Sequence, residues 1–483
     1  MPFPHQVQVN TDFRGVILRD NEIRQHKENI PVVTSVDPAR IRVLNDGTTR
    51  MGRYVLYWMQ SSQRIVDNPA LRYATELADR VELPLVVYFG LDATYPEANL
   101  RHFRFMVEGL AELARSLESL GILFVLRTES PERGVCVLAR DASMVVVDRG
   151  YLRPQQVMYR YAAEHCRCPL FQVEGNIIVP VEIASQKEEY SAATLRPKIE
   201  QLLDRFLYTA ETGSPGHSSL KLAIPTLSGE PVEALLSRLD IDQNVPASAT
   251  FTGGSNEANR RFEDFLAYRL DGFAERRNDP GRDGNSDMSP YLHFGQVSPV
   301  TLALRALQHE GAGVRAFLEE LVIRRELAIN FVRYNPHYDT FMSLPAWAQR
   351  TLDKHQGDRR EYLYSTEELE QAATHDPFWN AAQQEMENTG KMQGYMRMYW
   401  GKKIIEWSQT PQKAYSAALF LNNKYEIDGR DPNGYAGVAW CFGKHDRPWK
   451  EREVFGTVRY MNAAGLRRKF TMDSYLQRFP GIR

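Results

Sequence analysis

The chain has 483 residues, a mass of 55.5 kDa, a formal net charge of -2 and 43% apolar residues. This composition is typical of a folded globular protein and excludes the disordered, collagen-like and low-complexity classes. No apolar stretch approaches the ~18 residues that span a bilayer, and the N-terminus lacks the apolar core of a secretory signal, so the sequence predicts a cytoplasmic chain without membrane contact.

Short apolar runs alternate with helical patterns in the first third of the chain. After a polar N-terminal arm over residues 1–47, continuous β-branched and aromatic runs predict strands that are buried on both faces. Apolar residues from Phe103 to Leu120 recur at three- and four-residue steps, which predicts an amphipathic helix. This alternation predicts a parallel, Rossmann-like sheet in an α/β domain over residues 48–180. The expected strands are Tyr54–Trp58, Leu85–Phe89, Ile122–Leu126 and Met144–Val147, with a last strand at either Leu170–Val173 or Ile177–Pro180.

Residues 181–254 are punctuated by proline and glycine and predict a long connector with short helices. From Ser255 onward the pattern is helical almost to the end, which predicts an all-α domain over residues 255–483. Ser255 has the character of an N-cap, with a first helix over Ala258–Leu270. Asp376 followed by Pro377 predicts another helix start, because proline at the first helical position loses no hydrogen bond.

The four cysteines show neither the pattern of a disulfide framework nor a metal-binding spacing, so we expect a reduced protein with no metal. Charge is distributed unevenly: residues 397–470 carry 14 Lys and Arg against 7 Asp and Glu. This asymmetry indicates an anionic partner, although a solvated basic surface is the more frequent explanation.

Tryptophan is concentrated in the helical half, where five of the seven lie within 71 residues. Trp400 and Trp407 are seven positions apart, two helical turns, so they share one face of a helix. Such a cluster is part of a core, a chain for electron transfer, or a platform on which bases stack. The five are Trp379, Trp400, Trp407, Trp440 and Trp449.

Two polar segments of the helical half could carry chemistry. The segment SDMSPYLHFGQVSP places Ser286 and Ser289 at the start of a helix, where free amides suit a phosphate. The segment NNKYEIDGRDPNGYAGVAW, from Asn422 to Trp440, predicts a long polar loop, and long ordered loops are often functional. Plain serine caps and a plain surface loop are the alternatives.

Taken together, these segments resemble class II DNA photolyases. The resemblance rests on the α/β half, SDMSPYLHFGQ, EELVIRREL at Glu319–Leu327, MRMYWGKKIIEW at Met396–Trp407 and DGRDPNGYAGVAW at Asp428–Trp440, and it covers about residues 48–470. It implies an antenna-type α/β domain, a helical domain that binds FAD and DNA, and a monomeric lyase that repairs cyclobutane pyrimidine dimers in double-stranded DNA. Excited reduced FAD would pass an electron to a dimer that has been flipped out of the duplex.

The resemblance also implies FAD contacts. Phe273 stands where related enzymes place a tyrosine near the phosphate, and phenylalanine cannot donate that hydrogen bond. An arginine beside the flavin ring favours negative charge on it, and a neutral amide can serve N5 in both protonation states. The matching residues are Ser286, Asp287, Met288 and Ser289 around the phosphates and ribityl chain, Arg397 as the ion-pair partner of Asp428 beside the ring, Asn422 at N5, and Asp431 as a further contact.

For the lesion, Glu320 matches a carboxyl group that binds the base edge of the dimer, and Trp440 and Met398 would line its pocket. The tryptophan that class I enzymes carry just after the glutamate is missing here. The matching electron-transfer residues are Trp379, Trp400 and Trp407, and the candidate DNA contacts are Arg277, Lys444, Arg447 and Trp449.

Two other functions stay open. A cryptochrome-like blue-light sensor would more often carry a long C-terminal extension, and a 6-4 photoproduct photolyase would favour a histidine in the lesion pocket, whereas none occurs between His375 and His445. The antenna chromophore cannot be read from the sequence: a deazaflavin, a folate or none would fit. The expected location is the cytoplasm, or the nucleus in a eukaryote.

Overall fold

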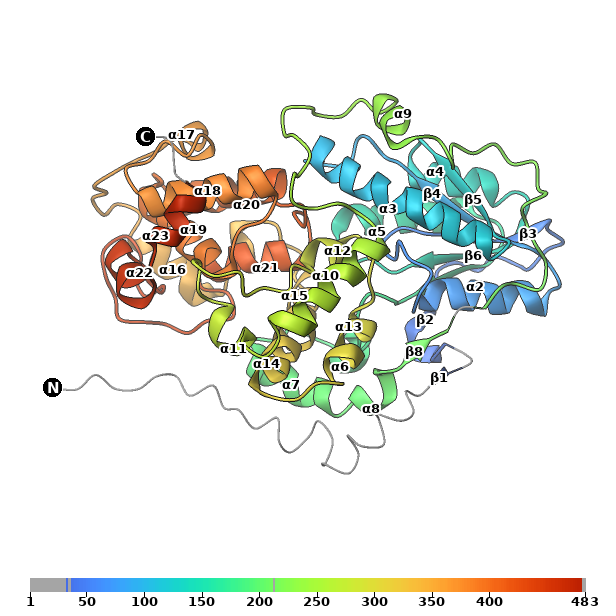
Figure 1. Ribbon diagram of the computed structural model, residues 1–483, viewed down its shortest axis with the longest axis horizontal. Helices are drawn as coiled ribbons and strands as arrows, with labels where there is room; N and C mark the ends of the chain where they lie inside the picture. Colours follow the sequence, from blue (N-terminus) through green and yellow to red (C-terminus); the bar gives the residue numbers. More distant parts are fainter. Residues whose placement is uncertain (1–31, 34–35, 212, 480–483) are drawn as a thin grey trace.

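The first half of the chain is built around a mostly parallel sheet (Figure 1). The computed structural model describes residues 32–33, 36–211 and 213–479, and within them six strands pair in the order β2-β7-β6-β3-β4-β5, with β2 antiparallel to β7. The strands of this sheet are β2 (Ile41–Val43), β3 (Tyr54–Trp58), β4 (Leu85–Gly90), β5 (Leu123–Arg127), β6 (Ala142–Asp148) and β7 (Leu170–Val173).

Helices cover both faces of the sheet. Alternate residues of β3 pack into separate clusters: Val55 joins α2 and α3 on one face, whereas Leu56 joins α4 and α5 on the other. Because both faces are covered, every residue of β3, β4 and β6 is buried, which explains the continuous apolar runs. The predicted α/β fold is confirmed. The covering helices are α2 (Pro69–Arg80), α3 (Leu100–Ser119), α4 (Pro131–Leu138) and α5 (Arg153–His165).

The edge of the sheet decides which of two predicted segments is the last strand, and it includes the end of the predicted N-terminal arm. The last strand is Leu170–Val173, and Ile177–Pro180 is not a strand. The end of the predicted arm is structured, because β2 adds to the free edge of β7. Residues 1–31 of that arm lie outside the described residues, and β1 (Val32–Val33) pairs in parallel with β8 (Thr209–Ala210).

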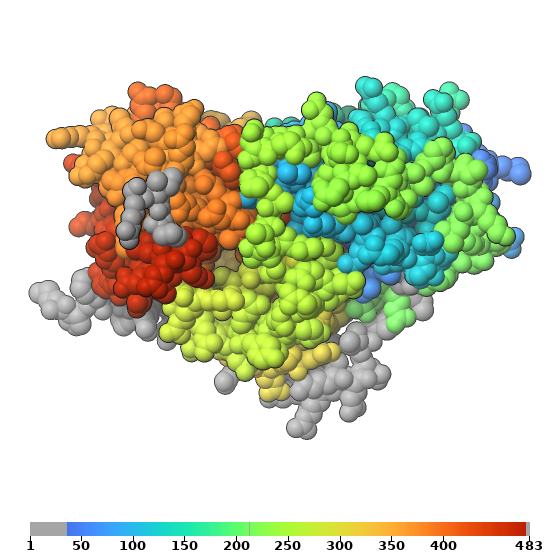
Figure 2. All heavy atoms as spheres, turned by 45° about the horizontal axis from the view of Figure 1, so that its top comes forward, coloured from blue at the N-terminus to red at the C-terminus, as the bar shows by residue number. Residues whose placement is uncertain are grey.

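The predicted connector contains short helices, of which α6, α7 and α8 pack on the helical half and α9 packs on the α/β half. In Figure 2 the green surface of its later part lies across the blue-green surface of the α/β half. Leu235 and Leu236 enter the apolar cluster of α3, and Arg104 of α3 pairs with Glu233. The helices are α6 (Val181–Ala184), α7 (Ala192–Glu200), α8 (Leu203–Phe206) and α9 (Val232–Ser237).

The second half is helical, as predicted, and one of its two predicted N-caps is confirmed. Asp376 is an N-cap whose carboxylate accepts from the backbone N–H groups of Phe378 and Trp379 at 2.9 and 3.2 Å. Ser255 is not a cap: Gly254 holds that position with φ of 128°, and the Ser255 hydroxyl donates to the Gln296 carbonyl instead.

The segment from Asn422 to Trp440 is mostly helical rather than a long loop. It contains the end of α20 and most of α21, so only residues 426–431 are non-helical. The reason is a second Asp–Pro start: the Asp431 carboxylate accepts from the Asn433 N–H at 2.8 Å, and Pro432 takes the first helical position.

The main helices of this half follow in chain order, with the π-helical segment η3 between α14 and α15. No helix among the described residues is long and apolar enough to cross a membrane. The bounds are α10 (Ser255–Tyr268), α11 (Phe273–Arg276), α12 (Ser289–His293), α13 (Pro299–Ala306), α14 (Ala312–Leu318), η3 (Glu319–Arg324), α15 (Arg325–Tyr334), α16 (Ala346–Lys354), α17 (Thr366–Glu370), α18 (Pro377–Thr389), α19 (Gly394–Trp407), α20 (Pro411–Tyr425), α21 (Pro432–Cys441), α22 (Ala463–Lys469) and α23 (Asp473–Arg478).

Buried polar side chains join the two halves. Glu326 of α15 accepts hydrogen bonds from the backbone N–H groups of Ile178 and Val179 at 2.7 and 3.2 Å. Arg64, after β3, donates to the carbonyls of Gly175 and Gly295 at 2.9 and 3.0 Å. These bonds fix the helical half against the carboxyl end of the sheet.

Candidate functional site

A cavity of about 490 Å³ lies in the helical half, between α11, α12, η3, α19 and α21. Its volume is in the range of cofactor and small-molecule sites. Residues far apart in the sequence meet on its wall, because the helices that carry them converge there. The predicted site residues on this wall are Phe273, Arg277, Ser286, Asp287, Met288, Ser289, Glu320, Arg397, Met398, Asp428, Asp431 and Trp440.

The carboxyl partner of Arg397 differs from the expectation. Arg397 Nη2 lies 2.8 Å from Glu426 Oε1, so the direct partner of Arg397 is Glu426 rather than Asp428. The loop 426–431 offers several carboxylates, and its sequence does not say which one reaches the guanidinium. Sequence reasoning therefore missed Glu426, although it stands inside the quoted motif.

The two neighbouring carboxyls respond differently to burial. Burial raises the pKa of Glu426 to about 8, even though Arg397 acts in the opposite direction. Burial also opposes ionisation of Asp428, but Arg397 and Lys391 hold the pKa of Asp428 below its ordinary value. At neutral pH the wall therefore carries the Asp428 carboxylate and the Arg397 guanidinium, and the protonated Glu426 carboxyl lies behind Arg397.

Several polar atoms in this wall and directly behind it are buried without a partner. Within the described part of the chain, Arg397 Nε, Glu426 Oε2 and Asp428 Oδ1 make no hydrogen bond. Buried polar atoms are nearly always paired, so this wall fits a ligand that offers both donors and acceptors. A flavin ring, with its N–H and carbonyl groups, has that character.

The wall around α12 carries hydroxyls and a lysine. Lys391 Nζ donates to Ser289 Oγ at 2.6 Å, and both residues border the cavity. Asp287, just before α12, has φ of 57°, a conformation that few aspartates adopt, so its neighbours hold it in place. Hydroxyl and ammonium donors of this kind suit a phosphate, and Lys391 has no sequence pattern that could have identified it.

Phe273 contributes packing rather than a hydrogen bond. It is buried, and its ring meets those of Phe265 and Phe317 at 5.4 and 6.0 Å between centroids. The structure thus explains how the chain tolerates phenylalanine here: the ring belongs to an aromatic cluster beside the cavity.

Glu320 and Glu319 point in different directions from the π-helical segment η3. Glu320 borders the cavity with its side chain 42% exposed and pairs with Arg277. Glu319 pairs with Arg196 and Arg324 at 2.8 and 3.0 Å, away from the cavity. Arg277, expected as a DNA contact, is instead tied to Glu320 on the cavity wall. Single π-helical turns in α-helices are frequent at functional sites.

The other predicted positions fall outside the cavity wall. Asn422 is buried beside the cavity, and its amide donates to Asn423 Oδ1 at 3.2 Å. Lys444 is buried, and its ammonium donates to the Glu188 carboxylate and to the Ser343 carbonyl, so in the DNA-free protein it is not available to a phosphate. Arg447 is exposed, and its guanidinium lies 5.7 Å from the Trp449 ring centroid.

The three predicted electron-transfer tryptophans form one buried stack. Trp379 of α18 lies 6.3 Å from Trp400 and 5.8 Å from Trp407, measured between ring centroids. Trp400 stands one helical turn after Arg397 on α19, so it is the member nearest the cavity in the helix register. Trp379 lies between the other two, an order that the sequence could not give. Gln383 of α18 accepts from Trp400 Nε1 at 2.9 Å and fixes that ring.

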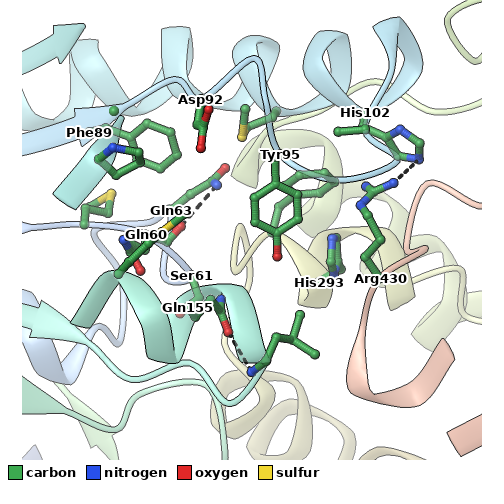
Figure 3. A pocket seen from close by; sticks show the side chains of 18 of the residues that line it. Gln60, Ser61, Gln63, Phe89, Asp92, Tyr95, His102, Gln155, His293 and Arg430 are labelled. Atoms are coloured by element: carbon green, nitrogen blue, oxygen red, sulfur yellow. Dashed lines mark hydrogen bonds between the residues drawn. The ribbon is translucent and has the colours of Figure 1, made fainter. Parts of the chain in front are cut away.

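A second cavity, of about 160 Å³, lies at the carboxyl end of the sheet (Figure 3). Methionine and phenylalanine side chains line it together with polar groups, which are Gln60, Ser61, Gln63, Asp92, Tyr95, His102, Gln155, His293 and Arg430. His293 borders both cavities, and its Nδ1 lies 3.0 Å from Asp431 Oδ2. No local pattern in the sequence indicates this site, because strand ends, loops and the helices α3, α5 and α12 all contribute to it.

Comparisons with known proteins agree on one family. The family model for DNA photolyase matches residues 55–216. The chain is 52% identical to the deoxyribodipyrimidine photo-lyase of Methanothermobacter thermautotrophicus over 444 residues, which are 92% of this chain and 98% of the relative.

Solved structures share the fold at low sequence identity. A bacterial class III photolyase from Agrobacterium tumefaciens aligns with a TM-score of 0.70 and 18% identity, over 90% of this chain and 88% of that chain. An archaeal photolyase from Sulfolobus tokodaii, whose structure holds two FAD molecules, aligns with a TM-score of 0.66 and 17% identity, over 88% of this chain and 89% of that chain.

Proposed function

Because the chain belongs to the DNA photolyase family, we propose that it repairs cyclobutane pyrimidine dimers by light-driven electron transfer to a flipped-out dimer. Light-dependent repair of DNA, and the binding of FAD, follow from that membership. The dimer type, the electron path and the residue roles are the proposed part.

One observation carries the proposal. The cavity has unpartnered flavin-type hydrogen-bonding atoms on Arg397 and Asp428, with Glu426 behind Arg397, and a second wall at Trp440 and the 42% exposed Glu320. A pocket that held only a cofactor would not need the partly exposed wall at Glu320 and Trp440. The arrangement supports a site where a bound cofactor meets a second ring system that enters from solution.

The residues that would hold FAD fall into two groups. Lys391, Ser286 and Ser289 would bind the phosphates, whereas Arg397, Glu426 and Asp428 would bind the ring. When bound, reduced FAD supplies the electron that opens the cyclobutane ring and takes it back afterwards. Arg397 would stabilise negative charge at the ring, and Asp431 would border it next to His293. Asn422 would have to turn its amide away from Asn423 to face the ring.

The open wall would receive the lesion. Trp440 and Met398 offer an apolar surface, and Arg324 lies over the Trp440 ring at 5.3 Å from the centroid. The Glu320 carboxyl would hydrogen-bond the base edge, with Arg277 as its partner in the free protein. Arg277 would then be released toward a phosphate, and Arg447 and Trp449 would contact DNA at the surface.

Trp400, Trp379 and Trp407 would reduce oxidised FAD by electron hopping, with electrons moving inward from Trp407 through Trp379 to Trp400 and then to the cavity. Their ring contacts of 5.8 to 6.3 Å support short hops. The path is separate from repair, which starts from the reduced cofactor.

The second cavity would hold an antenna chromophore. Its apolar side chains could pack on a planar ring system and its polar side chains could bind the edge of that ring, and its small volume favours a ring that enters only in part. His293 separates it from the main cavity, so energy would pass over a short distance. Deazaflavin and folate both remain candidates.

The two adjacent glutamates of η3 test the proposal. Glu320→Ala should lower repair per absorbed photon clearly while leaving dark binding of dimer-containing DNA and FAD content near normal, because its interaction strengthens only as negative charge builds on the dimer. Glu319→Ala is the matched control, since Glu319 pairs with Arg196 and Arg324 outside the cavity. If Glu319→Ala is the damaging change, or if both variants repair normally, the proposed lesion site is wrong.

A further inference from the structure

The aromatic packing continues beyond Trp407 to the protein surface. The Trp407 ring lies 5.5 Å from Tyr364 and 5.1 Å from His375, measured between centroids. The backbone N–H of Tyr364 donates to the Trp407 carbonyl at 3.1 Å, so the main chain holds this contact. His375 stacks on Tyr362 at 3.6 Å, and the Tyr362 side chain is 38% exposed.

The Tyr364 hydroxyl has a directed hydrogen-bond arrangement. Its oxygen accepts from the backbone N–H of His375 at 3.0 Å and lies 2.8 Å from His375 Nδ1. The two contacts are compatible when the hydroxyl donates its own proton to an unprotonated Nδ1. With that His375 tautomer, Nδ1 accepts the hydrogen bond of the Tyr364 hydroxyl and can take its proton.

We propose that Tyr364 and His375 form a proton-coupled terminus of the electron chain, an inference that rests on the proposed transfer through the tryptophans. Tyr364 gives one electron to oxidised Trp407 while its phenolic proton passes to His375 Nδ1. The O–H bond breaks, an N–H bond forms, Trp407 is restored, and a neutral Tyr364 radical faces an imidazolium. The primary oxidant is light-excited oxidised flavin. A thiol in solution later returns one electron, and the proton moves back from His375 to Tyr364.

The proton acceptor beside Tyr364 determines whether the oxidation can move from Trp407 to Tyr364. A tyrosine radical cation is a strong acid, so Tyr364 can reduce Trp407 only if its proton leaves in the same process. An imidazole accepts protons in the physiological range, and His375 is exposed, so its new charge is solvated. Once Tyr364 is a neutral radical, the positive charge no longer resides on the tryptophans, and return of the electron is slowed.

Transient absorption on the holoenzyme with oxidised FAD tests this. In the wild type, a tyrosyl signal should rise as the tryptophan radical signal decays, and this step should slow in D₂O. Tyr364→Phe should abolish the tyrosyl signal and prolong the tryptophan signal. His375→Phe keeps an aromatic ring against Tyr362 and Trp407 but removes the acceptor, so the tyrosyl yield should fall. Tyr362→Phe is the matched phenol control and should behave as the wild type.

The outcomes separate the inference from the function that it extends. If tryptophan radicals form but Tyr364→Phe and D₂O leave their decay unchanged, the Tyr364–His375 bond only fastens its loop, and the inference is wrong while the tryptophan chain stands. If the wild type shows no tryptophan radical, the chain and its terminus both fail. If Tyr362→Phe removes the tyrosyl signal, the terminus is misassigned. FAD content and thermal unfolding of each variant report folding, and the wild-type isotope effect needs no variant.

Discussion

Protonation at the main cavity is set residue by residue. Glu426 and Asp428 lie two positions apart, yet burial raises the pKa of the first to about 8, and the charges of Arg397 and Lys391 lower that of the second against burial. Although burial also opposes ionisation of Asp431, the hydrogen bond with His293 holds its pKa below the ordinary value. The loop therefore presents one neutral and two charged carboxyls at neutral pH.

This difference predicts unequal effects of two amide substitutions. Glu426→Gln replaces a protonated carboxyl by a neutral group of the same shape, so flavin absorbance per protein should stay near that of the wild type. Asp428→Asn removes a charge that the site stabilises, so the flavin content should fall clearly. The measurement is the absorbance ratio of flavin to protein after purification. Equal losses in both variants, or a larger loss in Glu426→Gln, would contradict the assignment.

Glu326 gives a prediction for the pH dependence of stability. Burial raises the pKa of Glu326 to about 8 from a model-compound value of 4.5, despite hydrogen bonds from Ile178 and Val179. Between these values the unfolded carboxyl has lost its proton and the folded one keeps it, so the free energy of unfolding falls as pH rises, by up to about 1.4 kcal/mol per pH unit.

Glu326→Gln should remove that contribution, because the amide oxygen can still accept both backbone hydrogen bonds. Chemical denaturation of the FAD-free protein at pH 5, 6.5 and 8 measures the slope. The variant should lose less stability than the wild type toward pH 8. A variant whose stability falls as steeply as that of the wild type would show that Glu326 is ionised in the folded state.

At the scale of elements, α18 and α19 carry the three tryptophans of the proposed electron path. Trp379 from α18 fits between Trp400 and Trp407, which stand two turns apart on α19. Trp400→Phe should therefore lose most of the photoreduction of oxidised FAD, while repair by chemically pre-reduced enzyme stays near normal. Trp449→Phe is the control, because Trp449 is an exposed residue outside the stack. Photoreduction at the wild-type rate in Trp400→Phe would remove Trp400 from the path.

Local signals in the sequence predicted elements better than they predicted partners. Asp376 with Pro377 identified the start of α18, and the same physics at Asp431 with Pro432 starts α21 where a loop was expected. The continuous apolar runs predicted the buried strands, since burial on both faces leaves no alternation. The partner of Arg397, the role of Lys391 and the second cavity depend on contacts between distant segments, which no local pattern encodes.

At the scale of the whole molecule, the basic character of residues 397–470 is only partly available to DNA. Lys444 forms an internal ion pair with Glu188, and Lys403 forms one with Glu406. Arg447 and Arg459 remain exposed on either side of Trp449, with guanidinium carbons 5.7 and 5.2 Å from its ring centroid. Charge counts along the sequence therefore overstate the number of phosphate contacts.

The affinity for dimer-containing DNA should fall steeply with salt, with a log–log slope of about -0.9 for each phosphate neutralised. Arg447→Ala should weaken binding and flatten that slope by up to about 1 unit. Arg133→Ala makes the same charge change at an exposed position of α4 in the α/β half and should leave the slope unchanged. DNA-binding titrations at four salt concentrations measure the slope. Identical slopes in both variants would place Arg447 outside the interface.

The central claim is that this fold repairs cyclobutane dimers with light. The most direct measurement gives the purified, reduced holoenzyme two oligonucleotides, one with a single cyclobutane thymine dimer and one with a 6-4 photoproduct, and follows each lesion by chromatography under blue light and in darkness. The account predicts that the cyclobutane dimer returns to two thymines only in light and that the 6-4 product persists. A dimer that survives illumination, or a 6-4 product that disappears, would contradict it.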